Sequence, residues 1–499
     1  MRGQCGRLIV LGVGTVALYG LLTWLSFAFV YGQGHAQRPI VLFVAVYAGI
    51  FICYGLAVYP LLGRAVRAPR STAVALVMMF GLLFRATLFF SQPIQEDDFY
   101  RYLWDGAVVA EGLNPYRFAP LRVQQQTDTG TAGAALRAYV QLAERDGRLS
   151  FVLSRVNHPH ISTVYPPFAQ AIFGLAAWLA PGSLSGLRLV FVAFDLGVCA
   201  LLLILLKHLG LSPLLLVVYA WSPLIIKETM NSAHYDVVPA CCVVLAVVLM
   251  VKGRDVLAHI SLAVAVLGKL YPVLLLPVFL ARVWKAHGWG RALLGLAAAA
   301  AVLLVGYAPF WPAGRALWTG TYTFAEQWQT NSLLFPGIVA LVGERWLANG
   351  VVGLGLAGAA FLVGSRSELE DDHQFVWSNG LLLGLLFLLS PVANPWYFVG
   401  LVPFLSIFPL RSWLLLSGLL SLYYVSFYFL YRGRLETFHV WLEYVPFYGM
   451  LAWEWWQGEY GKGRHGVGNE LDEEHTARVA LRSADGSDTV RTGRLGTGG

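Results

Sequence analysis

Long uninterrupted apolar segments dominate this chain, with little alternation between apolar and polar positions. Residues 8–31, for example, contain no charged residue. Because a membrane-spanning helix needs about 20 mostly apolar residues, this segment is long enough to cross a bilayer. Comparable segments follow at residues 39–62, 71–91, 187–206, 211–227, 233–251, 256–281, 291–310, 347–364, 376–389, 396–410, 412–430 and 438–456. The pattern predicts an all-α polytopic membrane protein with about 11–13 transmembrane helices.

Two further apolar segments, 168–180 and 333–342, are too short to span. A helix of about 13 residues covers about 20 Å, whereas the hydrocarbon core is about 30 Å thick. We expect both segments to form short re-entrant or interfacial helices. The sequence Lys269-Leu270-Tyr271-Pro272 interrupts segment 256–281, which is either one kinked span or two short limbs.

The charge distribution predicts how the chain lies in the membrane. Only 13% of residues are charged, against roughly 25% in soluble domains, and the net charge is +7. Much of the excess lies in short loops beside apolar segments, which favours a role in topology and not in nucleic-acid binding. The basic residues occur at Arg2 and Arg7, in 63–70, at Lys207, at Lys252 and Arg254, and in 282–291. The positive-inside rule makes these regions cytoplasmic, so that loop 92–162 is extracytoplasmic in a multi-pass protein of the cell inner (plasma) membrane. The polar, Gly-rich tail 457–499 is predicted to be a disordered cytoplasmic segment.

Loop 92–162 is too long for a simple connection and begins with a run of acids. If the first part is helical, Asp98, Arg101, Tyr102 and Asp105 share one face, at offsets of three, four and seven residues. An arginine beside a carboxylate keeps it ionised, and an ionised carboxylate can act as a general base. Spacing alone leaves a second interpretation open, a self-paired interfacial helix without a catalytic role. Further along the loop, residues 133–149 predict an amphipathic helix on the bilayer surface.

Several polar residues fall within or beside apolar segments, where they are costly in lipid and are functional candidates. Arg85 lies near the outer end of the third segment, although it could also extend its guanidinium to the interface. For Trp396 an ordinary interfacial aromatic belt is the favoured alternative. The other candidates are Lys227, His234, Asp236, Lys269 and Asn394.

A series of short motifs follows in order along residues 71–430. They are Asp97-Asp98-Phe99-Tyr100-Arg101-Tyr102-Leu103-Trp104-Asp105-Gly106, Gly112-Leu113-Asn114-Pro115-Tyr116, Asn157-His158-Pro159 with Thr163-Val164-Tyr165-Pro166-Pro167, Asn231-Ser232-Ala233-His234-Tyr235-Asp236, Lys269-Leu270-Tyr271-Pro272, and Ser390-Pro391 with Pro395-Trp396-Tyr397. In these motifs the chain resembles membrane glycosyltransferases of the GT-C class. The likeness is greatest to bacterial polyprenyl-phosphate-mannose-type transferases, including the glycosyltransferase 87 and DUF2029 group. There is also similarity to the first mannosyltransferase of GPI-anchor assembly.

The resemblance implies a GT-C-like catalytic domain at 71–456, after two N-terminal transmembrane helices in 1–70. It implies an inverting transfer of a sugar, mannose by resemblance, from a polyprenyl-phosphate-linked donor to a glycan or lipid acceptor. By position, Asp98 or Asp97 is the catalytic carboxylate, and we favour Asp98 because it shares a helix face with Arg101 and Asp105. Many of the known mannosyltransferases carry Asp-x-Asp where this chain has adjacent acids. This departure leaves open a divalent metal, Mg or Mn, which Asp97 and Asp98 would hold.

The departing phosphate carries developing negative charge, which needs fixed cations. We expect Arg85 and Arg101 above all to supply them. The predicted substrate- and phosphate-binding residues are Arg85, Arg101, Asp105, Tyr116, Arg117, His158, Tyr165, Lys227, His234, Asp236, Lys269, Asn394 and Trp396. Tyr102, Trp104 and Trp328 are candidates for stacking on sugar rings. The alternative function is a transporter or flippase for an anionic or lipid-linked solute, although the chain shows no internal repeat of the kind that transporters often contain.

Overall fold

The computed structural model describes residues 2–30, 32, 34–62, 71–126 and 133–458, and the elements in these ranges are all helices. Seven helical segments of the described ranges are long and apolar enough to cross a membrane. They are α1 (Arg2–Ser26), α2 (Ile40–Val58), α3 (Ser71–Phe89), α9 (Leu184–His208), α15 (Trp289–Tyr307), α18 (Arg345–Ser365) and the segment Arg411–Leu430. A pair bent by 49°, Pro213–Ala220 and Pro223–Asn231, makes an eighth if it is counted as one span. The predicted all-α polytopic fold is confirmed.

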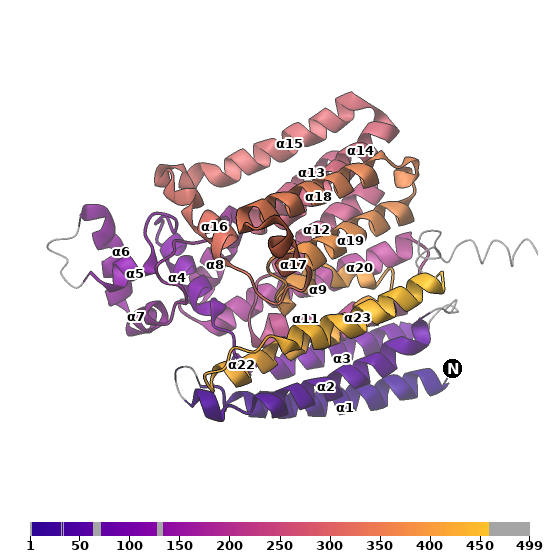
Figure 1. Cartoon of the computed structure of the whole chain (residues 1–499), viewed down its shortest axis with the longest axis horizontal. Helices are drawn as coiled ribbons and strands as arrows, with labels where there is room; N and C mark the ends of the chain where they lie inside the picture. The colour runs from indigo at the N-terminus through magenta and orange to yellow at the C-terminus, as the bar shows by residue number, and fades with distance from the viewer. Residues whose placement is uncertain (1, 31, 33, 63–70, 127–132, 459–499) are drawn as a thin grey trace, which may run out of the picture.

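The larger predicted number of spans includes segments that fold as shorter helices. Helices α12 (Val237–Val251) and α13 (Asp255–Gly268) have 15 and 14 residues, and they run beside the long helices (Figure 1). Segment 256–281 proves to be two limbs, because α13 ends at Gly268 and α14 begins only at Leu276. Lys269, between them, has extended backbone angles, and Pro272 lacks the N–H that a continuous helix needs.

The two segments predicted to be too short for spanning are short helices, α8 (Pro167–Leu179) and α17 (Leu334–Val342). Helix α8 packs closely on α4 (Asp98–Ala110). A Cβ atom at Gly106 would lie 2.3 Å from the carbonyl oxygen of Phe173, so only glycine permits this crossing. The contact fixes the first helix of loop 92–162 against the transmembrane bundle.

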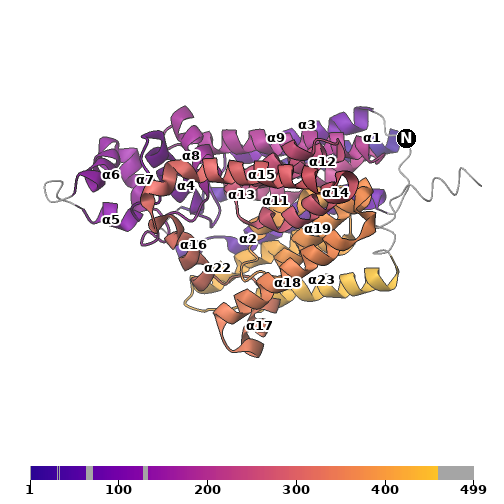
Figure 2. The same ribbon diagram turned by 90° about the horizontal axis from the view of Figure 1, so that it is seen from above.

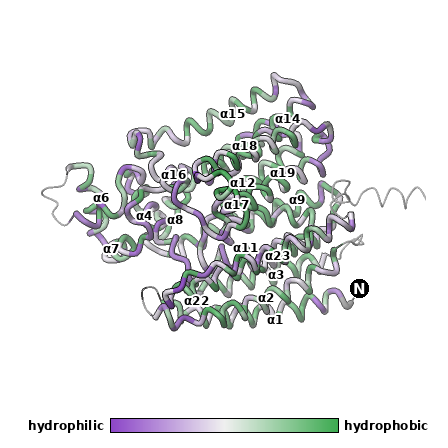
Figure 3. Tube along the Cα trace, in the orientation of Figure 1, coloured by the Kyte–Doolittle hydropathy of each residue, from purple (hydrophilic) through white to green (hydrophobic). Residues whose placement is uncertain are grey.

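Loop 92–162 folds into α4, α5 (Pro120–Gln124), α6 (Ala134–Arg145) and α7 (Gly147–Ser154), which together form one end of the molecule. These helices lie at the left in both Figure 1 and Figure 2, and hydrophilic residues are frequent there in Figure 3. The predicted helix at 133–149 exists as α6, but its apolar side chains Leu136, Tyr139 and Ala143 are buried within the protein. Its apolar face therefore packs on neighbouring helices and not on a bilayer surface, which corrects the prediction.

Several of the basic turns meet at the opposite end of the bundle. His208 Nε2 lies 2.7 Å from Asp372 Oδ2, Lys252 Nζ lies 3.0 Å from His208 Nδ1, and Arg282 pairs with Asp372. The N-terminus and the turn from α14 (Leu276–His287) into α15 lie at this end in Figure 1, far from α4–α7. Residues 63–70 and the predicted tail from 459 onward lie outside the described residues.

Candidate active site

A cavity of about 690 Å³ lies where loop 92–162 meets the transmembrane bundle. Its wall comes from the segment before α4, the segment before α8, α16 (Ala316–Gln327), α19 (Asp372–Leu389), the 3₁₀ segment Pro395–Gly400 and α22 (Val425–Leu430). Of the predicted site residues, it brings together Asp97, Asp98, Arg101, His158, Tyr165, Asp236, Lys269, Asn394 and Trp396.

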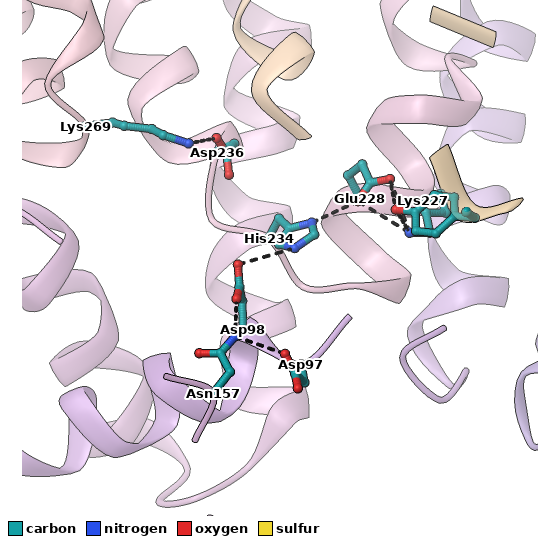
Figure 4. Close-up of polar contacts among 9 residues, drawn as sticks. Asp97, Asp98, Asn157, Lys227, Glu228, His234, Asp236 and Lys269 are labelled. Atoms are coloured by element: carbon teal, nitrogen blue, oxygen red, sulfur yellow. Dashed lines mark hydrogen bonds and ion pairs between the residues drawn. The ribbon is translucent and has the colours of Figure 1, made fainter. Parts of the chain in front are cut away.

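The two adjacent acids lie at the start of helix α4, so the helical condition on which the shared face depended is met. Asp97 precedes the helix and Asp98 is its first residue. The Asn157 side chain donates from Nδ2 to Asp97 Oδ1 at 2.9 Å and to Asp98 Oδ1 at 2.6 Å (Figure 4). Burial, followed by the charge of Asp98, raises the pKa of Asp97 to about 6. The side chain of Asp98 keeps 24% of its surface exposed, which leaves this carboxylate accessible from the cavity.

His234 lies between Asp98 and a second acid, Glu228 (Figure 4). Its Nδ1 is 2.8 Å from Glu228 Oε2, its Nε2 is 3.9 Å from Asp98 Oδ2, and its ring stacks on Trp396 with centroids 4.2 Å apart. A proton on Nδ1 satisfies Glu228 and leaves the Nε2 lone pair towards Asp98. Within the described residues, this buried Nε2 has no hydrogen-bond partner. The imidazole therefore connects the cavity acid to a buried polar cluster.

That buried cluster neutralises Glu228. Lys227 Nζ lies 3.2 Å from Glu228 Oε1, and the Tyr424 hydroxyl donates to the same oxygen at 2.8 Å. The Lys227 ammonium is fully buried, contacts the Tyr424 hydroxyl and does not line the cavity. Lys227 thus supports the site from behind and does not face a ligand in the cavity.

Arg101 lines the cavity and is held in place by two oxygens. Its Nη2 donates to the carbonyl of Ile161 at 2.5 Å, and its Nε lies 3.4 Å from Asp105 Oδ1. Asp105 itself is buried away from the cavity, where Gln170 Nε2 donates to its other oxygen at 3.3 Å. Asp105 is therefore placed to orient Arg101 and not to contact a ligand.

A second cation, Lys269, lies on another part of the wall. Its ammonium pairs with Asp236, and Nζ lies 3.7 Å from the centre of the Tyr397 ring and 5.6 Å from that of Tyr235. All four residues line the cavity. Lys269 lies at the break between α13 and α14, where the extended backbone forms part of the cavity wall.

Arg85 occupies a different place from the one predicted. Its Nε lies 2.5 Å from Asp195 Oδ2, its Nη1 donates to the Ala220 carbonyl at 2.7 Å, and the Tyr219 hydroxyl donates to Asp195 at 2.8 Å. The pair joins α3 to α9 and does not reach the cavity. Arg85 was expected at the outer edge from its position along the span, but its ion-pair partner is 110 residues away and could not be read from that position.

Two more predicted ligands lie outside the cavity wall. The Tyr116 hydroxyl donates to the backbone carbonyl of Tyr165 at 2.7 Å, so Tyr116 supports a lining residue. Arg117 is exposed and lies beside the Phe118 ring. Among the aromatic candidates, Tyr102 and Trp328 line the cavity, whereas Trp104 is buried elsewhere.

Sequence reasoning assigned no role to three polar residues of the site, Asn157, Glu228 and Glu96. Asn157 stands in a quoted motif and Glu228 in a polar cluster, but spacing could not show that they contact Asp98 and His234. Glu96 lines the cavity, and its burial raises its pKa well above the ordinary range. The run of acids Glu96-Asp97-Asp98 was the sequence signal that could have identified Glu96 as a site residue.

In the described ranges no group of three His, Cys, Asp or Glu side chains is placed to hold a metal, so an ion at Asp97 and Asp98 would need further ligands from substrate or water.

Strained backbone marks the same region. The non-glycine residues with positive φ in the described ranges are Gln95, His158, Ala233 and Asn331. Gln95 and His158 line the cavity, Ala233 precedes His234, and Asn331 follows the lining residue Thr330. Such conformations persist only where surrounding contacts enforce them, and they tend to cluster at functional sites.

Two family models match separate parts of the chain. Glycosyltransferase family 87 matches residues 163–391, and the alpha-(1->6)-mannopyranosyltransferase N-terminal domain family matches residues 3–134. The second match includes Asp97 and Asp98, and the first includes His234 and Lys269.

A curated relative agrees with these matches. It is alpha-(1->6)-mannopyranosyltransferase A of Mycobacterium tuberculosis (strain ATCC 25618 / H37Rv), which is 27% identical over 321 residues. The alignment covers 60% of this chain and 54% of the relative, so the chain spans about half the length of this relative. No solved structure matches the chain significantly. In both matched regions and in the curated relative, the comparisons support the resemblance to GT-C-type bacterial mannosyltransferases that the motifs predicted.

Proposed function

We propose that this protein is a membrane mannosyltransferase that transfers mannose from a polyprenyl-phosphate donor to a hydroxyl of a glycan or lipid acceptor, with inversion. The observation that carries the proposal is the exposed carboxylate of Asp98 in a cavity that also presents the Lys269 cation. The similarity to mannosyltransferases supplies the sugar and the class of reaction.

The proposed mechanism assigns the base to Asp98. Its carboxylate takes the proton of the acceptor hydroxyl while the hydroxyl oxygen attacks the anomeric carbon. The bond from that carbon to the donor phosphate breaks on the opposite face, so the configuration inverts. The phosphate leaves with both bonding electrons, and Arg101 and Lys269 are the cavity cations placed to stabilise its charge.

An apolar part of the cavity suits the lipid of the donor. Leu270, Leu383, Leu386, Phe387 and Leu401 contribute to its wall. An isoprenoid chain gains free energy by leaving water for such a surface. Lys269 directly precedes Leu270, so a phosphate beside its ammonium would place the attached lipid next to the apolar residues.

The proposal places the active site on the extracytoplasmic side. The support is the group of basic residues at the opposite end of the bundle, where His208, Lys252 and Arg282 meet Asp372. Polyprenyl-phosphate sugars present their phosphate at the headgroup level of a membrane, and a cavity between a long loop and the bundle suits such a substrate.

The structure does not favour the transporter alternative. Arg85 and Asp195, two buried charges within the long apolar helices, neutralise each other and lie away from the cavity. The charges that line the cavity instead lie where loop 92–162 meets the transmembrane bundle.

The test supplies purified protein with an acceptor panel and either polyprenyl-phosphate-mannose or GDP-mannose, free of other membrane enzymes. We expect transfer from the lipid-linked sugar and none from the nucleotide sugar. The Asp98→Asn variant is the matched control for contaminating activity. Efficient transfer from GDP-mannose, with none from a panel of lipid-linked sugars, would contradict the proposed donor.

A further inference from the structure

Two aromatic rings at the end of α16 form a flat surface on the cavity wall. Phe324 and Trp328 are four residues apart, and their rings stack with centroids 5.3 Å apart and planes at 25°. Both line the cavity. His158 packs edge-on against Trp328 at 4.7 Å, and its neighbour Asn157 holds both Asp97 and Asp98. The aromatic surface is therefore linked to the acid pair through consecutive residues.

Backbone contacts hold this surface rigidly. The Arg345 guanidinium donates to the carbonyl oxygen of Trp328. Thr330 then joins Pro391 and Ala393 through two backbone hydrogen bonds of 3.0 Å, which form an isolated parallel bridge. A surface fixed in this way loses little conformational entropy when a ligand binds.

An amide donor lies beside the same segment. Thr330 Oγ1 donates to Asn394 Oδ1 at 2.7 Å, which fixes the orientation of the Asn394 amide. Among the described residues, no hydrogen bond from Asn394 Nδ2 is found, and Asn394 lines the cavity. Its N–H groups are placed to donate to a ligand.

This combination of groups matches the chemistry of a sugar ring. A pyranose has an apolar face of C–H groups and a polar rim of hydroxyls, so an aromatic surface with an adjacent amide donor complements both. The α16 residues beside Trp328, Glu326 and Gln327, are exposed and polar, which favours approach from water. We propose that Phe324 and Trp328, with Asn394, bind a pyranose ring of the acceptor. The proposal rests on the transferase function above and adds the residues that hold its acceptor.

The experiment compares Trp328→Ala with Trp318→Ala. Trp318 is on the same helix, packs against Tyr307 with the ring planes tilted, and does not line the cavity, so it is a matched control. With a soluble oligomannoside as acceptor, we expect Trp328→Ala to raise the acceptor KM about tenfold. The donor KM and the kcat at saturating acceptor should stay within about twofold of the wild type. Trp328→Phe should restore most of the acceptor affinity, and Trp318→Ala should behave as wild type.

Two results would overturn the inference. In the first, Trp328→Ala leaves the acceptor KM unchanged; in the second, it raises the donor KM and not the acceptor KM. Calorimetric binding of the oligomannoside to the Asp98→Asn protein, with and without Trp328→Ala, separates this inference from the proposed function. If no lipid-linked sugar is transferred but binding depends on Trp328, the proposed function fails and the glycan site stands. If transfer occurs but Trp328→Ala does not change the binding of the oligomannoside, only the proposed glycan site is wrong.

Discussion

Two groups of buried charge in this protein resemble each other in the sequence and differ in the structure. Each group pairs an acid with a base that lies in or beside an apolar segment. Arg85 and Asp195 lie within α3 and α9, whereas Asp98 follows α3 and His234 precedes α12. In the first group the guanidinium and the carboxylate satisfy each other, with further hydrogen bonds from Tyr219 and to Ala220. In the second, Asp98 is partly exposed to a cavity and His234 Nε2 has no hydrogen-bond partner among the described residues.

The difference teaches which charges are available for chemistry. A charge in an apolar segment is costly and therefore suggests function, but a complete set of partners removes that cost without any ligand. Accessible groups with remaining hydrogen-bonding capacity are the better guide, because a substrate can satisfy them. By this criterion we propose Asp98, Arg101 and Lys269, which line the cavity, as site residues, and we propose a structural role for the buried Arg85.

The largest expected effect tests the structural half of this comparison. Arg85→Leu leaves the Asp195 carboxylate buried without its cation, which typically costs about 3–5 kcal/mol of stability. We expect a marked fall in the unfolding midpoint of the detergent-purified protein, with normal turnover per folded molecule. The double variant Arg85→Leu, Asp195→Leu should recover much of the loss. A variant of normal stability with low turnover would mean that Arg85 acts on substrate, and the comparison would fail.

The next largest effect concerns Asp98. Asp98→Asn keeps the shape of the side chain and removes the base, so we expect turnover to fall by about 10²-fold or more. Thermal stability should stay near that of the wild type, because Asp98 is partly exposed and its hydrogen bond from Asn157 can be replaced. Asp97→Asn should reduce turnover less. Wild-type turnover in a properly folded Asp98→Asn protein would show that another group is the base.

Local features of this fold were predictable, and long-range pairings were not. Given a helix, the spacing of Asp98, Arg101 and Asp105 predicts their shared face, and the apolar segments show the membrane class directly. The break at Lys269 was visible as a lysine and a proline within an apolar segment. No spacing rule places His234 beside Asp98 or Asp195 beside Arg85, because these contacts depend on how distant helices pack.

The same limit explains α6 and the acid pair. The amphipathic pattern of α6 correctly predicted a helix with an apolar face, but a pattern cannot say whether lipid or protein covers that face. Likewise, the adjacent acids could be recognised, but the Asn157 side chain that bridges them comes from the far end of the loop.

A smaller effect is expected at Lys269. Lys269→Gln removes a cavity cation and leaves Asp236 unpaired near the proposed phosphate position. Because a hydrogen bond to a charged group contributes about 1.5–3 kcal/mol, we expect the donor KM to rise at least about tenfold. The acceptor KM should change little, and Lys269→Arg should retain most of the donor affinity. A rise confined to the acceptor KM would place the phosphate elsewhere in the cavity.

The smallest expected effect is a pH dependence that belongs to Asp97. Its pKa is about 6 in the folded protein, raised by burial and by Asp98 from an ordinary value of 3.8. Between about pH 4 and pH 6 the folded state therefore holds a proton that the unfolded state has lost, so ionising Asp97 lowers stability as pH rises through this window. The same ionisation places a negative charge beside Asp98 and strengthens it as a base, so turnover should rise a few-fold as pH passes about 6.

Thermal unfolding and turnover measured from pH 4 to pH 8 should show both changes in the wild type. Asp97→Asn should flatten both, whereas the double variant Arg85→Leu, Asp195→Leu, which removes both members of the buried pair, should keep the shape of the stability profile. If the stability change in this window persists in Asp97→Asn, another carboxyl causes it, and Glu96 is then the group to substitute next because burial also raises its pKa.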